Sequence, residues 1–155
     1  MSLIQSSYGT PNHLGNFEVV TLEGNNLVHY FRDNGPGKWS RGAVITTKAT
    51  APGSLIQSSY GTPGATGNFE VVVTEGKDLV HYWRNNSPGK GNWIRQAVIT
   101  SNATGPAALI QSTYGTPGAL GNFEVIVHEG KHLVHYWRNN SPEGNQQWNR
   151  GAVIA

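Results

Sequence analysis

The chain has 155 residues, of which 13% are charged and 37% hydrophobic, with 20 glycines, 8 prolines and no cysteine. This composition excludes disorder driven by charge, and the missing cysteine excludes disulfides, thiolate zinc sites and a thiol nucleophile. The net charge is +2 and the Lys and Arg residues are scattered singly, so neither nucleic acid nor an anionic membrane is expected as a partner. No secretory signal and no long apolar run is visible, so we expect no membrane insertion and leave the location in the cell open.

One unit is repeated three times along the chain. The tetrapeptide Leu-Ile-Gln-Ser begins at residues 3, 55 and 109, and residues 54–88 and 108–142 are identical at 29 of 35 positions. We assign the repeats to residues 2–53, 54–107 and 108–155. Copies this similar point to recent amplification, to an excised fragment or to deliberate design.

The middle repeat contains four β-like runs in succession. The first is predicted at residues 55–60 and ends at the Gly- and Pro-containing turn 61–64. The other three are predicted at residues 68–74, 79–84 and 93–99. These runs are rich in β-branched and aromatic residues, and no segment has a helical period, which indicates strands. Since the other repeats carry the same runs, we predict an all-β chain of about twelve strands.

The second and third runs are predicted to form a hairpin, because a short Gly-containing segment joins them. Strand alternation places Phe69 and Val71 on one face and Glu70 and Val72 on the other. Both faces are thus partly apolar, which is typical of a sheet covered on both sides, as in stacked propeller blades. Spacing alone leaves two architectures open, a β-trefoil closed by three units and a β-propeller whose three blades recruit another chain.

The segment from Gly67 to Arg84, followed by Trp93, resembles the blade repeat of PLL-like bacterial β-propeller lectins. Those blades combine a G-x-(L/F)-E-V-x-V strand, a Gly-containing turn, a (W/V)-H-x-W strand and a Trp-led outer strand, and the resemblance extends over all three repeats. It implies three four-stranded β-propeller blades per chain and clefts between blades that bind fucose-type or related neutral sugars. The family's full-length members have more blades in one chain, so a ring closed by oligomerisation is expected, as a homodimer of six blades or a trimer of nine.

The side chains expected at sugar sites recur once per repeat. Aromatic rings pack on the C–H face of a sugar, while Arg and Glu bond its hydroxyl groups. Each type also has a structural alternative, as an aromatic wedge between blades, a Glu bonded to a neighbouring blade's backbone or a blade-to-blade Glu–Arg pair. The candidate sugar-binding residues are Glu18, Glu70, Glu124, Arg32, Arg84, Arg138, Trp39, Trp93, Trp148, Tyr30, Tyr82 and Tyr136.

We predict no catalytic residue, metal site or cofactor. Single recurring histidines, His29, His81 and His135, are expected to hold strands through imidazole hydrogen bonds, and His128 and His132 of the third repeat to lie at the surface. No paired carboxylates, G-x-S-x-G or H-E-x-x-H motif is recognisable. The sequence therefore predicts a non-enzymatic lectin whose partners are glycans and other copies of itself. The alternative is a designed or structural β-propeller scaffold without a ligand.

Overall fold

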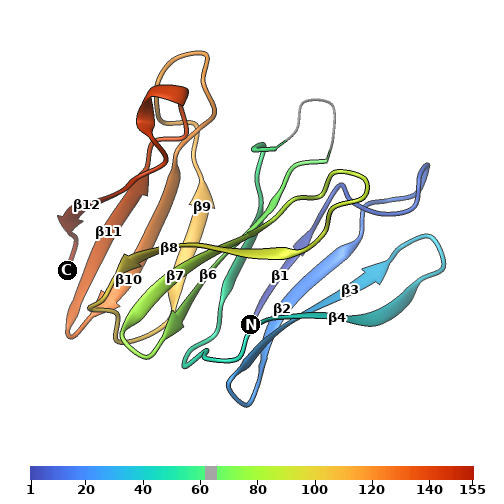
Figure 1. Cartoon of the computed structure of the whole chain (residues 1–155), viewed down its shortest axis with the longest axis horizontal. Helices are drawn as coiled ribbons and strands as arrows, with labels where there is room; N and C mark the ends of the chain where they lie inside the picture. Colours follow the sequence, from blue (N-terminus) through green and yellow to red (C-terminus); the bar gives the residue numbers. More distant parts are fainter. Residues whose placement is uncertain (62–65) are drawn as a thin grey trace.

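Three separate four-stranded antiparallel sheets make up the chain, which a computed structural model describes for residues 1–61 and 66–155. The sheets lie side by side, and each consists of four strands that follow one another in the sequence (Figure 1). The predicted all-β class and the division into three four-stranded units are confirmed. Because each repeat forms its own sheet, the arrangement is that of propeller blades and not of a trefoil. The turn predicted at residues 61–64 lies, except for its first residue, outside the described residues.

The strand order is the same in every blade, with the first strand at one edge of the sheet and the fourth at the other. Blade 1 consists of β1 (Ser2–Gln5), β2 (Phe17–Glu23), β3 (Asn26–Asp33) and β4 (Lys38–Thr46). Blade 2 consists of β5 (Ser54–Gln57), β6 (Phe69–Glu75), β7 (Asp78–Arg84) and β8 (Trp93–Thr100). Blade 3 consists of β9 (Ala107–Gln111), β10 (Phe123–Glu129), β11 (His132–Arg138) and β12 (Trp148–Val153), with a short 3-10 turn, η1 (Pro142–Gly144), before β12. Within the described residues, no helix has the length and apolarity to cross a membrane.

The first strand of each blade is shorter than predicted because the chain bends sharply after it. In blade 2, β5 ends at Gln57, and Gly67 then packs directly against the backbone of Ser58. A Cβ atom on Gly67 would lie 1.8 Å from the Ser58 carbonyl oxygen, so this close approach requires glycine. Tyr60, two residues after Ser58, therefore lies outside the strand and lines a cavity between blades.

The core lies between the blades. On one face of blade 2, Phe69 and Val71 are fully buried in a cluster with Val20 and Leu27 of blade 1. On its other face, Val72 is fully buried in a second cluster with Val125 of blade 3. The alternation predicted for this strand is therefore correct, and the middle sheet is covered on both sides.

The first strands of the three blades line up against one another. Strand β1 lies against β5, and β5 against β9. Side-chain amides join them, since the Ser7 N–H donates to Gln57 Oε1 at 2.8 Å and the Ser59 N–H donates to Gln111 Oε1 at 2.8 Å. These contacts fix the spacing between blades at this edge of the sheets.

Candidate binding clefts between the blades

A cleft with a volume of about 220 Å³ lies between blades 1 and 2, and we name it cleft A. Blade 1 supplies a carboxylate, an imidazole, an amide and two aromatic rings, and blade 2 supplies a guanidinium and an indole. The lining residues are Tyr8, Asn16, Glu18, His29, Phe31, Gly42 and Ala43 of blade 1 and Arg84, Gly91 and Trp93 of blade 2.

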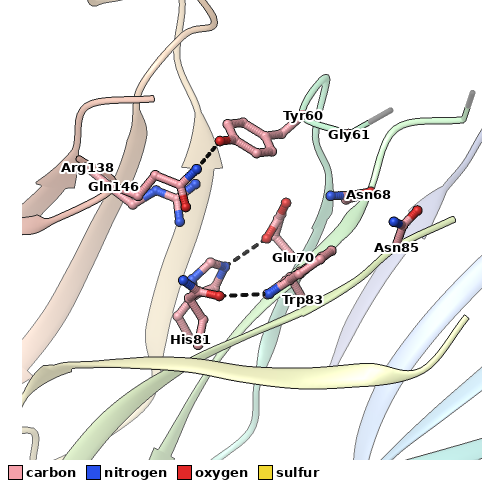
Figure 2. A pocket seen from close by; sticks show the side chains of 10 residues that line it. Tyr60, Gly61, Asn68, Glu70, His81, Trp83, Asn85, Arg138 and Gln146 are labelled. Atoms are coloured by element: carbon pink, nitrogen blue, oxygen red, sulfur yellow. Dashed lines mark hydrogen bonds and ion pairs between the residues drawn. The ribbon is translucent and has the colours of Figure 1, made fainter. Parts of the chain in front are cut away.

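The equivalent space between blades 2 and 3, named cleft B, has a volume of about 380 Å³. Its lining repeats the tyrosine, asparagine, glutamate, histidine and arginine of cleft A at the corresponding positions. The lining residues are Tyr60, Gly61, Asn68, Glu70, His81, Trp83, Asn85 and Gln96 of blade 2 and Arg138 and Gln146 of blade 3. Figure 2 shows Glu70, His81 and Trp83 on one side of this cleft and Arg138 with Gln146 on the other, with Tyr60 bonded to Gln146 across it.

A buried Glu–His pair forms the floor of each cleft. The distance between Glu18 Oε2 and His29 Nε2 is 2.6 Å, and between Glu70 Oε2 and His81 Nε2 it is 2.8 Å. The two residues of a pair are diagonal neighbours on adjacent antiparallel strands, since His29 lies opposite Val20, two positions beyond Glu18. The second carboxylate oxygen accepts a hydrogen bond from a serine of the same blade, at 2.9 Å in the case of Ser58 and Glu70.

This pairing differs from the structural role that we expected for the glutamates. Glu18 and Glu70 bond neither an arginine nor the backbone of a neighbouring blade; their partners are a histidine and a serine of their own blade. The expectation that the recurring histidines hold strands through imidazole hydrogen bonds is met by these contacts. A carboxylate that is hydrogen-bonded through both of its oxygens keeps its orientation fixed.

The tryptophans that open the fourth strands wedge the blades together. Trp93 stacks on Phe69, with ring centroids 6.4 Å apart, and contacts the His29 ring edge to face at 5.6 Å. Trp148 repeats this arrangement against Phe123 at 6.4 Å and His81 at 5.6 Å. Each indole therefore packs between two blades and, in cleft A, also forms part of the cleft wall.

An arginine reaches into each cleft from the following blade. The Arg84 guanidinium lies 5.1 Å from the centre of the Tyr8 ring, and its Nε donates to the Gly91 carbonyl oxygen at 2.9 Å. Arg138 lies 4.6 Å from the Phe123 ring centre. Its side chain is buried, and this burial lowers the pKa of Arg138, while the nearby charge of Glu70 raises it. Both guanidinium groups thus lie over aromatic rings, and both arginines line a cleft.

Several polar atoms at the clefts are buried and have no hydrogen-bond partner among the described residues. They are Asn16 Oδ1 in cleft A, Asn68 Oδ1 and His81 Nδ1 in cleft B, and the indole nitrogen of Trp148, whose ring contacts His81. A buried polar atom without a partner is unfavourable, and such atoms concentrate where a ligand or an ordered water completes the structure. The asparagine oxygen recurs at equivalent positions of the two clefts, which marks the clefts as the candidate site.

Two positions that contact each other distinguish cleft B from cleft A. Blade 2 has Gln96 where blades 1 and 3 have Gly42 and Gly151. Gln96 Oε1 accepts a hydrogen bond from the Trp83 indole N–H at 2.9 Å, whereas the residue equivalent to Trp83 in blade 1 is Phe31. Cleft B is therefore more polar along this wall than cleft A.

The predicted tyrosines are placed elsewhere. Tyr30, Tyr82 and Tyr136 do not line either cleft; their hydroxyl groups donate to the turn glutamates Glu23, Glu75 and Glu129. Burial, and then the bond to Glu75, raises the pKa of Tyr82. The second arginine of each blade, such as Arg95, pairs with the same turn glutamate, so the observed Glu–Arg pairs lie within blades and not between them.

The remaining candidates lie on the outer faces of blades 1 and 3, which no other blade covers among the described residues. Glu124 pairs with His135 on the outer face of blade 3, in an open depression of about 460 Å³. Arg32 and Trp39 lie on blade 1, and Trp39 is 48% exposed. The sugar-site candidates Glu18, Arg84 and Trp93 meet in cleft A, and Glu70, Arg138 and Trp148 meet around cleft B. Glu124, Arg32 and Trp39 are not brought together within one chain.

Sequence reasoning missed several lining residues. Tyr8 and Tyr60 follow the first strand, and their recurrence in a Ser-x-Tyr-Gly segment was the available signal. Asn16 and Asn68 belong to the recurring Gly-Asn-Phe segment, whose glycine attracts attention as a turn residue while its asparagine is the group that lines the cleft.

Among the described residues, no group of three His, Cys, Asp or Glu side chains converges in a way that could hold a metal ion. Neither a protein-family model nor a curated protein matches the chain. The function is therefore inferred from the geometry of the clefts.

Proposed function

We propose that the chain is a carbohydrate-binding protein, a lectin, whose sites are the clefts between neighbouring blades. The observation that carries this proposal is the repetition of one lining. Glu, His, Asn and Tyr from one blade face an Arg from the next blade, twice in the same chain, and a Trp of that next blade packs against the His each time. Core packing alone does not require polar groups without partners at equivalent positions of two interfaces.

The chemistry of the lining suits a neutral, hydroxyl-rich ligand. Aromatic surfaces such as Tyr8 and Trp93 can pack on the C–H face of a sugar ring, and a few fixed polar groups orient it. Each cleft contains one guanidinium and one carboxylate, so an uncharged ligand needs no further counter-charge. Fucose-type or related neutral sugars, with hydroxyl groups on one face and C–H groups on the other, match this pattern.

We propose that the clefts bind without catalysing a reaction. Hydrolysis of a glycosidic bond by the common mechanism uses two carboxyl groups roughly 5–9.5 Å apart. The described residues that line cleft A include one carboxylate, Glu18, and those that line cleft B include one, Glu70. Both already accept hydrogen bonds from serine and histidine, which is the environment of a fixed acceptor.

A glycan array with the purified chain tests the proposal. We expect binding to a set of related neutral glycans, strengthened by multivalent display, which can raise apparent affinity about 10²–10⁴-fold. The matched control is Trp93→Ala combined with Arg138→Ala, which removes one wall from each cleft. Binding that survives in this variant would place the sites elsewhere, and an array without any bound glycan would favour a scaffold without a ligand.

We further propose that the blades close into a ring with a second copy of the chain. Three blades fall short of the minimum of about four for a propeller, and a dimer of six is the smallest ring that whole copies can make. The end faces support this proposal. Leu3 is 64% exposed on blade 1, whereas its equivalents Leu55 and Leu109 are only 2% and 3% exposed because a preceding blade covers them.

The opposite end of the chain shows the complementary feature. Tyr114 of blade 3 is 79% exposed, whereas Tyr8 and Tyr60 are partly buried, Tyr8 against Phe69 of the following blade. The outer faces of blades 1 and 3 thus correspond to the two sides of an interface that neighbouring blades form twice within the chain. Light scattering is expected to give the mass of a dimer, or of a trimer with nine blades. A stable monomer would contradict ring closure and leave clefts A and B as the only sites proposed.

A further inference from the structure

The outer face of blade 3 carries half of a cleft. Glu124 Oε2 lies 2.7 Å from His135 Nε2, and Ser112 Oγ donates to Glu124 Oε1 at 3.0 Å, as in the closed clefts. However, the His135 side chain is 32% exposed and Glu124 17%, compared with 1% and 2% for His81 and Glu70. The pair is built in the same way and lacks only the cover that the next blade provides elsewhere.

Blade 1 carries the other half. Its Arg32 and Trp39 occupy the repeat positions of Arg84 and Trp93, which cover the Glu18–His29 pair of cleft A. Among the described residues, Arg32 and Trp39 cover no such Glu–His pair, and Trp39 is 48% exposed. The Arg32 guanidinium already lies over the ring of Phe17, 5.7 Å from its centre, which is the arrangement seen for Arg84 over Phe69 at 5.6 Å. This half is therefore preformed.

We propose that a third saccharide site, cleft C, forms at the junction of two chains, from Tyr114, Glu124, His135 and Trp137 of one chain and Arg32 and Trp39 of the partner subunit. This inference rests on the proposed lectin function and on ring closure, and adds that neither chain holds the site alone. Each chain then contributes three clefts to the ring, of which one is completed by its neighbour.

Cleft C also differs from the other two in the hydrogen bonds that it offers. In cleft B, the Trp83 indole N–H donates a hydrogen bond to Gln96 Oε1. Blade 3 has Gly151 at that position, and the Trp137 indole N–H has no partner among the described residues. Cleft C thus presents a free indole donor to a hydroxyl oxygen of the sugar.

The number of L-fucose molecules bound per chain tests the inference, measured by titration calorimetry and native mass spectrometry on the assembled protein. We expect three per chain in the unmodified protein and two in Arg32→Ala or Trp39→Ala. Arg41→Ala is the matched control on the same blade, because Arg41 pairs with Glu23 away from the clefts, and it should keep three. Two bound molecules in the unmodified ring would overturn cleft C and leave clefts A and B standing, whereas none would contradict the lectin function itself.

Mixing two defective chains separates a shared site from a general loss of binding. Arg32→Ala damages one half of cleft C, and Glu124→Gln damages the other half without changing its shape. In a mixed ring, one junction carries both changes and another carries neither, so part of the third site is expected to return on mixing. If mixing restores nothing although mass spectrometry shows mixed rings, Arg32 and Glu124 do not meet in one site and the inference is wrong.

Discussion

Replacement of Arg84 by alanine gives the sharpest test of how cleft A binds. The Arg84 Nε donates to Gly91 and Nη1 to Asn86 Oδ1 at 3.1 Å, and the guanidinium lies over Tyr8, so its orientation is fixed before a ligand arrives. The remaining N–H groups have no partner among the described residues and border the cleft. Loss of a hydrogen bond to a charged group costs about 1.5–3 kcal/mol. Affinity at cleft A should therefore fall by about tenfold to a hundredfold.

Arg95→Ala is the matched control for this change. Arg95 belongs to the same blade, its side chain is 49% exposed, and it pairs with Glu75 on the side away from the cleft. Calorimetric titration with L-fucose, after circular dichroism has shown that both variants are folded, should give weaker binding for Arg84→Ala and unchanged binding for Arg95→Ala. Equal affinities in the two variants would refute the assignment of Arg84 to the site.

Three further predictions concern the fold and its charged groups. Gly121→Ala should lower the free energy of unfolding by about 2 kcal/mol or more, because its Cβ would lie 1.6 Å from the Ser112 carbonyl oxygen. Gly105→Ala is the control and should change the free energy of unfolding little, since the nearest atom to its Cβ lies at 3.7 Å. Similar melting temperatures for the two variants would contradict the steric argument. Tyr82→Phe should lower the free energy of unfolding by about 1–2 kcal/mol, because the hydrogen bond to Glu75 is lost, and should leave sugar affinity unchanged. A lower affinity measured by calorimetry would mean that Tyr82 belongs to the binding site. Burial raises the pKa of Glu129, but hydrogen bonds from Tyr136, Thr100 and Arg150 outweigh burial and lower this pKa below the ordinary 4.5. A carboxylate whose pKa is lowered in the folded state stabilises the fold above pH 4.5. This stabilisation is lost as the pH falls through the pKa of the folded state. Glu129→Gln should therefore melt earlier than the unmodified chain at neutral pH and approach it in acid, and a gap of constant size down to pH 3 would contradict the pKa shift.

The repeat pattern predicted three four-stranded units because strand and turn signals agree within each unit, while the choice of blades over a trefoil came from the family resemblance. Alternation assigned Phe69 and Glu70 to opposite faces, and the structure has Phe69 in the core and Glu70 in cleft B. The first strand was predicted too long, since its β-like residues continue through Tyr60. The contact between Gly67 and the Ser58 backbone joins a residue just after β5 to a residue just before β6, nine positions along the chain, which a local pattern does not report.

The candidate site was only partly predictable, for a geometric reason. The repeats indicated which residues recur, and the alternation of side chains indicated which face of a strand each residue lies on. Neither pattern indicated which faces of neighbouring blades contact each other. Tyr82 and Tyr60 both recur and are both aromatic, yet Tyr82 points to Glu75 and Tyr60 to cleft B. The direction of Tyr60 depends on the bend after β5, and the direction of Tyr82 on its strand face. The role of Gln96 likewise follows from its distance to Trp83, which lies on a neighbouring strand.

A crystal structure of the assembled protein soaked with L-fucose would show whether the clefts between the blades bind sugar. We expect a sugar ring in cleft A between Tyr8 and Trp93, with a hydroxyl group bonded to Arg84, and a second sugar at the equivalent position in cleft B. Sugar bound on an outer strand face, or clefts filled only by ordered water at saturating L-fucose, would contradict it.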